Sequence, residues 1–587
     1  MTANNDSIRV QLFRVEGRHR LLTRLLCGTL AAAGLGWGAG VYAQTAPSAG
    51  SLQQQMEREQ QGGSQRLQLQ PSGKATPEAP PVGQTVTVRA FKFKGNTLLS
   101  SEELGAALAG LVGRPLDFAR LQSSAVIVAD LYRDKGWVVQ TYLPEQDIGK
   151  GEVTIAIVEA VFGQTRISGP SGQRVRADVI ERIFARQQTS GQFLSMTALE
   201  RALLLADDLP GLSVSGTLAA GQRSGQTDLV LQLADESWLT GSVSADNTGS
   251  VSTGSRRTQA SLALNSPSGA ADALSLSAMS SEGTLYGRLG YSLPLGSDGW
   301  RIGVNASRLT YELISDAYKS LNASGNSTTT GLELSYPLLR SRALNVSATL
   351  SADHKKYFNV SGGATSSTYR NVPLSLGLSG SSFDALGGGG ANALSVVLTE
   401  GRLNLGGSPT QASDATTTRT AGTYAKLRYA LSRQQQISTG VSLYAALAGQ
   451  WANKNLDSSE KFYLGGSSGV RAYPSSEGGG SQGQMLNVEL RWQLPEGMNL
   501  TGFYDHGRVT QNVDNDFAGA PAVNRFALKG AGLALGWRHG SGLALQATYA
   551  RRLGNNPNAI TTDVNRGADQ DGTLHRDRFW LTASVAF

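Results

Sequence analysis

The chain has 587 residues, of which 40% are hydrophobic and only 17% are charged, and it contains 71 glycines. This length exceeds that of one ordinary domain, and the low charge favours strands and turns over solvated helices. The formal net charge is +7, but residues 1–43 hold five arginines and two acids, which leaves +4 for the rest. So small a charge gives no reason to expect nucleic acid as a partner.

Residues 1–43 have the pattern of a secretory signal peptide. A basic lead precedes an apolar run at 25–42, and Val41 and Ala43 supply the small residues of a cleavage site. The single cysteine, Cys27, lies in this segment, so we expect no disulfide and no thiolate metal site in the mature chain. Beyond it no apolar run of about 18 residues occurs, which leaves a soluble exported protein or a membrane β-barrel.

Residues 44–85 are rich in Gln, Ser, Gly and Pro, with one exception. The stretch SLQQQMEREQQ, residues 51–61, lacks Gly and Pro and consists mostly of good helix formers. We therefore predict a short polar helix at 51–61, followed by a linker of about twenty residues at 62–83.

A βααββ pattern follows twice, at residues 86–160 and 161–236. In the first copy, Ser100 and Glu103 have the spacing of a helix capping box, and Gly136 ends the second helix. Two copies of about 75 residues form an internal repeat of small α+β domains.

From 237 to 587 no convincing helix is expected, and apolar and polar residues alternate instead. In NVELRWQL, for example, Val488, Leu490 and Trp492 alternate with polar residues. About sixteen such segments occur, roughly 22 residues apiece, which suits membrane-spanning strands of about 9–11 residues with their connections. A secreted β-helix or sandwich is the alternative, but neither is expected to end on an aromatic strand terminus. The last strand places these residues on one face: Phe579, Leu581, Ala583, Val585 and the terminal Phe587.

Sequence signatures of catalysis are weak. GGGSQG, residues 478–483, matches a dinucleotide fingerprint and overlaps a nucleophile-elbow match, but neither has the required strand–turn–helix context. The chain has no P-loop, and the histidines beyond the signal are scattered without metal spacing: His354, His506, His539 and His575. We therefore expect no enzyme activity, no cofactor and no metal site.

GFYDHGRV, residues 502–509, places a carboxylate in the middle of a predicted spanning strand. A carboxylate that faces lipid is costly, so Asp505 is expected to face the barrel lumen, with Phe503 and Gly507 on the same face. A lumenal carboxylate favours a guanidinium partner, which can bind it with two hydrogen bonds.

FYLGGSSGVRAYPSSEGGG, residues 462–480, is a Gly- and Ser-rich segment with one arginine. Arg471 lies between Val470 and Tyr473, in a stretch that is almost uncharged. The segment is either a solvated surface loop with an incidental charge, or a loop whose arginine reaches back to a fixed carboxylate.

These features together resemble a known family. The two βααββ repeats resemble POTRA domains, and with a barrel of this length the chain resembles the outer-membrane transporters of two-partner secretion, of the haemolysin-activation/secretion type. That superfamily carries V-R-G-[YF] at the tip of a sixth surface loop that folds into the lumen, and F-x-D-x-G on the inner barrel wall. Here the motifs read Val470-Arg471-Ala472-Tyr473 and Phe503-x-Asp505-x-Gly507, and Ala472 stands where the family usually has Gly.

The resemblance implies a mainly β protein: a 16-stranded transmembrane antiparallel β-barrel at 237–587, preceded by two POTRA domains at 86–160 and 161–236. It also implies a plug helix and linker within 44–85 and a lumen-inserted loop at 455–484. Arg471 would be anchored by Asp505, and Phe587 would serve as the C-terminal signal for barrel insertion.

The resemblance further implies a function. The protein would export one unfolded partner exoprotein, of a large β-helical haemolysin or adhesin type, from the periplasm to the surface of a Gram-negative cell without ATP, by type V secretion. Its other partners would be outer-membrane lipid and the barrel-assembly machinery. The alternatives are a barrel-assembly factor, which usually has more POTRA domains, a passive porin, which would lack them, and an outer-membrane enzyme, for which no nucleophile–base pair is evident.

Overall fold

The computed structural model describes residues 46–63, 85–168, 174–223, 225–561 and 566–587. The signal peptide predicted for 1–43 and most of the predicted linker lie outside these residues. Within this part of the chain, no helix is both long enough and apolar enough to cross a membrane.

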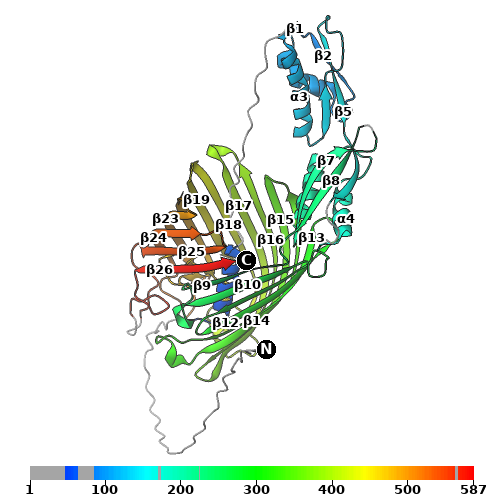
Figure 1. Ribbon diagram of the computed structural model, residues 1–587. Coiled ribbons are helices and arrows are strands. Elements are labelled where there is room, and N and C mark those ends of the chain that lie inside the picture. Colours follow the sequence, from blue (N-terminus) through cyan, green and yellow to red (C-terminus); the bar gives the residue numbers. More distant parts are fainter. Residues whose placement is uncertain (1–45, 64–84, 169–173, 224, 562–565) are drawn as a thin grey trace, which may run out of the picture. The chain divides into compact units, whose positions relative to one another are not determined.

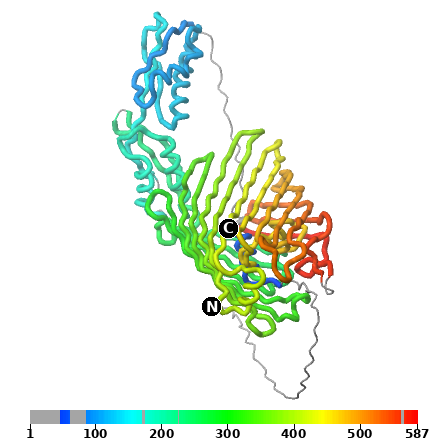
Figure 2. Tube along the Cα trace, turned by 180° about the vertical axis from the view of Figure 1, so that it is seen from behind, coloured from blue at the N-terminus to red at the C-terminus, as the bar shows by residue number. Residues whose placement is uncertain are grey.

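Sixteen antiparallel strands form a closed barrel, which confirms the predicted fold class. Each strand pairs with the next barrel strand in sequence, and the last pairs with the first. Figure 1 labels most of these strands, and in Figure 2 their colours run in sequence order around the barrel. The strands are β9 (Leu239–Asp246), β10 (Arg257–Asn265), β11 (Ala273–Ser280), β12 (Thr284–Leu295), β13 (Trp300–Glu312), β14 (Ser324–Arg340), β15 (Leu344–Ser361), β16 (Ala364–Asp384), β17 (Gly390–Asn404), β18 (Gly422–Ser438), β19 (Val441–Ala452), β22 (Gln482–Gln493), β23 (Met498–Thr510), β24 (Arg525–Arg538), β25 (Leu543–Arg552) and β26 (Asp577–Ala586).

The alternating sequence pattern places apolar side chains on the outer surface of the barrel. On β16, Leu374, Leu376 and Leu378 are about half exposed. Asn371, which lies on the opposite face of the same strand, is fully buried. Phe579 and Phe587 are likewise 65% and 57% exposed on the outer face, as predicted for the last strand. An outer belt of this kind matches the apolar band of a membrane barrel, whose interior is polar.

The connections between barrel strands contain short helical segments and one long loop. The segments are η2 (Val251–Thr253), η3 (Lys319–Leu321), η4 (Leu386–Gly388) and α6 (Gln411–Thr416). The long loop, residues 453–481, contains the short paired strands β20 (Phe462–Tyr463) and β21 (Gly479–Gly480).

The predicted polar helix is present as α1 (Ala49–Gly63), longer at each end than the predicted 51–61. The prediction was too short because it excluded the glycines at both ends, whereas contacts with the barrel support the first turn. The side chain of Ser48 accepts a hydrogen bond from the Ser51 N–H, and the Ala49 N–H donates to Asn359 Oδ1 on β15 at 2.9 Å. The wall of the barrel therefore satisfies a backbone donor that a helix N-terminus leaves free.

Two small α+β domains precede the barrel and have the same topology, as the repeat predicted. Each has a three-stranded sheet, in the orders β2-β5-β4 and β6-β8-β7. The first and last strands of each sheet in the chain are parallel neighbours, and the strand between them in the chain lies antiparallel at the edge. The first contains β1 (Val86–Thr87), β2 (Ala90–Lys94), α2 (Ser101–Leu108), η1 (Ala109–Leu111), β3 (Pro115–Leu116), α3 (Phe118–Asp134), β4 (Val139–Tyr142) and β5 (Glu152–Glu159). The second contains β6 (Val161–Ser168), α4 (Ala177–Gln187), α5 (Met196–Asp207), β7 (Leu212–Ala220) and β8 (Gln226–Asp235).

A buried carboxylate organises the first of these domains. Glu159, at the end of β5, accepts hydrogen bonds from the Thr97 N–H at 2.7 Å, the Leu98 N–H at 2.8 Å and the Tyr132 hydroxyl at 2.8 Å. Burial raises the pKa of Glu159, but these hydrogen bonds outweigh it and hold the pKa below its usual value. The carboxylate thus ties the β2–α2 turn to α3.

We predict that Glu159→Gln weakens the first domain, because all three donors bind one oxygen of Glu159 and a neutral amide oxygen is a weaker acceptor than a carboxylate oxygen. Loss of hydrogen bonds to a charged acceptor costs about 2 kcal/mol. Because the folded-state pKa is depressed, the carboxylate's contribution is present above about pH 4.3 and is lost as the pH falls through the folded-state value. Amide exchange of peptides from 90–159 in the full-length protein, corrected for intrinsic rates, measures this. Equal protection of both proteins at pH 7 would contradict the prediction.

Candidate functional site

The tip of the long loop packs against the inner wall of the barrel. Val470, Ala472 and Tyr473 are fully buried and lie in one apolar cluster with Leu528 and with Phe503 of β23. The loop covers 453–481 rather than the predicted 455–484. It begins earlier because β19 ends at Ala452, and it ends earlier because Gln482 to Gln484 already belong to the paired strand β22.

Arg471 at this tip binds Asp505 of β23 through three hydrogen bonds. Its Nε and a terminal guanidinium nitrogen donate to the two carboxylate oxygens at 2.9 and 2.7 Å, and its backbone N–H donates at 3.0 Å. The guanidinium carbon also lies 3.5 Å from the ring centroid of Phe503, in cation–π geometry. The structure thus brings together the arginine and the carboxylate that the two sequence motifs supplied.

The same arginine binds a second acid that the sequence did not single out. Its other terminal nitrogen donates to Glu489 Oε1 on β22 at 2.8 Å, and Glu489 in turn accepts from Arg491 at 2.6 and 2.8 Å. Asn487 Nδ2 donates to Asp505 at 2.9 Å. Asp505 has no exposed side-chain surface and Arg471 only 11%, so each charge is compensated within the lumen rather than by bulk water.

Two small residues allow the tip to approach the wall. A Cβ on Gly507 would lie 2.7 Å from a Leu464 methyl group, and one on Gly530 would lie 2.6 Å from the Ala472 side chain. Ala472 does not adopt a positive φ; the nearest non-glycine residue that does is Ser476, at 67°. Alanine in place of the usual glycine therefore introduces no backbone strain at the tip.

The loop is held at a second point where it enters the lumen. Glu460 is buried and pairs with Lys426 of β18, and it accepts from Asn371 Nδ2 of β16 at 2.7 Å. Burial raises the pKa of Glu460, but the ammonium groups of Lys426 and Lys355 outweigh it and hold the pKa below its usual value. Glu460 thereby fixes the start of the loop to β16 and β18.

A third contact joins the loop to the last surface connection, residues 553–576. Glu477 is fully buried and accepts hydrogen bonds from the Gln570 N–H at 2.8 Å and from Asn556 Nδ2 at 3.1 Å. Burial, reinforced by the neighbouring Asp569, raises the pKa of Glu477 to about 7. The loop is thus tied to the wall at both its entrance and its tip, and to a neighbouring loop beyond the tip.

Helix α1 lies against this loop and against the lumenal side chains of β10, β13, β14 and β15. Arg58 donates to the carbonyl oxygens of Tyr463 and Gly465 at 2.8 and 3.1 Å. Glu57 pairs with Lys355 of β15, and Glu59 pairs with Arg257 of β10, at 2.9 and 2.7 Å. The helix is thus held in the lumen by hydrogen bonds and ion pairs on one part of its surface. Ala49, Leu52 and Met56 hold it on another part, where they are buried in an apolar cluster with lumenal side chains of the barrel.

The site offers no arrangement suited to a metal. Among the described residues, no group of three or more His, Cys, Asp and Glu side chains has metal-binding geometry. What the site can do is hold two obstructing elements, the loop and α1, inside a polar barrel.

The comparisons with known proteins agree with this architecture. The family model described as haemolysin secretion/activation protein ShlB/FhaC/HecB matches residues 225–539, and that of the ShlB-type POTRA domain matches residues 86–160. The heme/hemopexin transporter protein HuxB of Haemophilus influenzae is 26% identical over 93% of this chain and 96% of its own length. The outer membrane transporter CdiB of Dickeya dadantii is 25% identical over 75% of this chain and 79% of its own.

Solved structures show the same fold. CdiB from Escherichia coli has a TM-score of 0.69 at 23% identity, covering 93% of this chain and all of that one. CdiB from Acinetobacter baumannii has a TM-score of 0.63 at 18% identity, covering 92% and 98%.

A barrel with POTRA-type domains before it and a helix and an anchored loop in its lumen defines an outer-membrane transporter with periplasmic POTRA domains. The chain belongs to the haemolysin secretion/activation family, the outer-membrane transporters of two-partner secretion, whose members work with secreted partner exoproteins.

We predict that Arg471→Ala leaves the barrel in the outer membrane but reduces export at least tenfold. Breaking a buried ion pair costs about 3–5 kcal/mol, and less in a partly wet lumen, whereas the strand ladders do not depend on it. Asp505→Ala should have the same effect, and the double variant should be no worse than the worse single one. Exported protein in the medium is measured beside the heat-modifiability of the barrel on gels.

Arg508→Ala is the matched control, because Arg508 lies on the same strand and its side chain is exposed. Normal export by Arg471→Ala would contradict the anchor. Strictly additive defects of the two single variants would mean that Arg471 and Asp505 act separately.

Proposed function

We propose that Arg471 and Asp505 anchor the long loop, so that the loop and α1 close the resting pore. When the loop and α1 are displaced, this chain exports one specific unfolded exoprotein. The observation that carries the proposal is the nature of their contacts. Arg471, Glu460, Arg58, Glu57 and Glu59 hold the two elements by ion pairs and hydrogen bonds. These polar contacts can be exchanged for water. The apolar packing of Met56 on α1 and of Val470 and Tyr473 at the loop tip adds a free-energy cost to opening, which binding of the arriving exoprotein would offset.

The lumen also supports passage of an extended chain. Its inner face near the middle of the wall carries small hydroxyl side chains; Ser375 of β16 and Thr399 of β17, for example, hydrogen-bond to each other at 2.8 Å. Neutral hydroxyl groups offer weak contacts to any sequence that passes. With no ATP required, folding of the exoprotein outside the cell would supply direction.

Capture of the exoprotein is proposed for the second POTRA domain. Strand β7 (Leu212–Ala220) is the edge of its sheet and pairs only with β8 among the described strands. An exposed edge can accept an extended segment by backbone pairing, with little demand on sequence.

The cargo is proposed to be a large secreted β-helical protein of the haemolysin or adhesin type. The names of the relatives support transport in general: HuxB is called a heme/hemopexin transporter protein, and CdiB is called an outer membrane transporter, a name that gives no cargo. We further propose that the chain is not an enzyme, contacts outer-membrane lipid, is inserted by the barrel-assembly machinery through the signal ending at Phe587, and binds no nucleic acid.

Two other functions are less well supported. A barrel-assembly factor shares the fold, as the BamA structure from Haemophilus ducreyi does at a TM-score of 0.51 and 14% identity, and that likeness concerns the fold alone. A passive porin would not need α1 and the long loop in its lumen.

Deletion of the gene tests the export proposal. The secreted proteins of wild-type and deletion strains are compared by mass spectrometry. We expect loss of one very large β-rich protein, encoded beside this gene and restored by the gene in trans. General loss of outer-membrane barrels would indicate an assembly factor, and an unchanged set of secreted proteins would reject export.

We also predict that removal of residues 51–61 raises single-channel conductance in planar bilayers, because α1 occupies the lumen. Glu57→Gln combined with Glu59→Gln should raise the frequency of open events, since Lys355 then loses its ion pair with α1 and Arg257 keeps only its ion pair with Asp246 of the wall. Glu102→Gln combined with Glu181→Gln, an equal charge change at exposed positions of α2 and α4, is the control. Identical conductance of the deletion and wild-type channels would contradict the plug.

A further inference from the structure

The barrel closes through its shortest ladder. Strands β26 and β9 share five residue pairs, from Thr582 opposite Asp246 to Ala586 opposite Ser242. The next shortest ladders, β9–β10, β10–β11 and β11–β12, have eight. Because each pair contributes backbone hydrogen bonds, this seam has the fewest to hold it.

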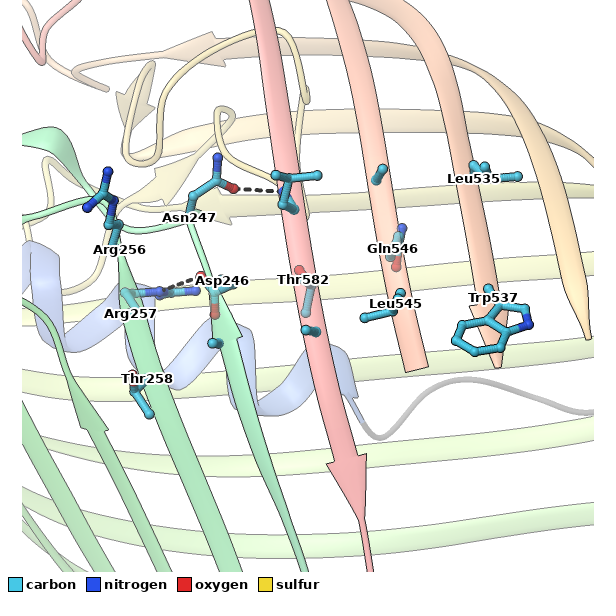
Figure 3. Close-up of a pocket in the computed structure, with 14 residues that line it drawn as sticks. Asp246, Asn247, Arg256, Arg257, Thr258, Leu535, Trp537, Leu545, Gln546 and Thr582 are labelled. Carbon is cyan, nitrogen blue, oxygen red and sulfur yellow. Dashed lines mark hydrogen bonds and ion pairs between the residues drawn. The ribbon is translucent and has the colours of Figure 1, made fainter. Parts of the chain in front are cut away.

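Contacts at both ends lengthen the seam. Gly241 and Phe587 exchange backbone hydrogen bonds at 2.9 and 3.0 Å. At the other end, the Asn247 side chain takes the place of a missing strand residue: its Nδ2 donates to the Phe579 carbonyl at 2.9 Å and its Oδ1 accepts from the Leu581 N–H at 2.8 Å. Figure 3 shows Asn247 directed at the neighbouring strand.

Side chains on the outer face give the seam little support. A hollow of about 670 Å³ lies there, and Figure 3 shows the residues that line it, among them Leu535, Leu545 and Trp537. At the seam itself, its lining includes the small register partners Ala245 and Ala583, beside the larger Leu581 of β26. Apolar packing across the ladder on this side therefore rests mainly on one larger pair, Val243 and Val585, whose side chains are themselves nearly half exposed.

On the inner face, the loop tip contacts both sides of the seam. Trp580 of β26 is 7% exposed, and its indole Nε1 donates to the carbonyl oxygen of Arg471 at 2.8 Å. The Ser475 hydroxyl donates to the carbonyl oxygen of Thr248, just after β9, at 2.9 Å. Tyr473 lies between Arg471 and Ser475 in the loop. Its ring packs against the guanidinium of Arg552 on β25, whose carbon is 4.3 Å from the Tyr473 ring centroid.

We propose that the loop tip is an inner clasp of the barrel seam, with Trp580 and Ser475 as its positioning residues. The anchor at Asp505 fixes the tip to β23, and the tip then bridges β26 to the β9 side across the weakest ladder. Displacement of the loop removes both bridges at once. The seam then loosens, and the circumference of the barrel can adapt to a passing chain.

This clasp deepens the proposed function, since it links clearance of the lumen to the width of the pore, and so rests on it. Its structural part does not need cargo. Amide exchange of the purified full-length protein in lipid nanodiscs, without exoprotein, therefore tests the clasp alone, and its failure would leave the export proposal intact.

The test compares Ser475→Ala and Trp580→Phe with wild type. A buried acceptor left without its donor weakens its surroundings enough to speed local opening about tenfold. We expect amides of 241–246 and 579–586 to exchange about tenfold faster in each variant, while the β15–β16 ladder remains unchanged. A disulfide between Ser244→Cys and Ser584→Cys, which are register partners, should restore protection in Trp580→Phe.

The chain supplies matched controls for both substitutions. Ser468→Ala changes an exposed serine of the same loop, and Trp451→Phe changes an exposed tryptophan of β19, a strand that is not at the seam. Both should exchange as wild type does. Unchanged exchange at the seam in Ser475→Ala and Trp580→Phe would overturn the clasp, and so would an equal acceleration across β15–β16, which would mean that the whole barrel had loosened.

Discussion

The ion pair between Arg471 and Asp505 is the interaction on which the arrangement of the lumen depends. A Gly- and Ser-rich loop has a large conformational entropy, and a fixed position inside a pore requires strong, directional contacts. The carboxylate of Asp505 receives three hydrogen bonds from one residue of the loop, and Glu489 receives a fourth. Because Asp505 belongs to a barrel strand, the rigidity of the ladder is transmitted to the loop tip.

Other elements take their positions from that loop. Arg58 binds carbonyl oxygens at 463 and 465, so α1 is held partly by the loop rather than by the wall alone. Trp580 of β26 binds the loop tip, and Ser475 of the tip binds Thr248 just after β9, so the closing strands of the barrel share the same support. A single loop thus joins the plug, the wall and the seam, and we expect a change at its anchor to reach all three.

Much of this could be predicted from the sequence, because a membrane barrel forces a simple pattern. Alternation along each strand fixes which side chains face the lumen, and it placed Asp505 there correctly. The sequence could not predict how β22 and β23 are paired. Alternation places Glu489 on the lumenal face, but only the observed register places it opposite Phe503 and so beside Arg471. Trp580 was missed for a different reason, since its partner is a backbone carbonyl that no motif reveals. The bounds of α1 were too narrow because barrel contacts override the low helix propensity of glycine.

The central claim is that the anchor at Asp505 positions the loop, and through it α1 and the seam. Amide exchange of the Arg471→Ala protein tests it most directly, measured on the purified full-length chain in lipid nanodiscs beside wild type. The account predicts faster exchange at 462–480, 49–60 and 579–586 together, with the β15–β16 ladder unchanged. Faster exchange confined to the loop, with α1 and β26 protected as in wild type, would contradict it.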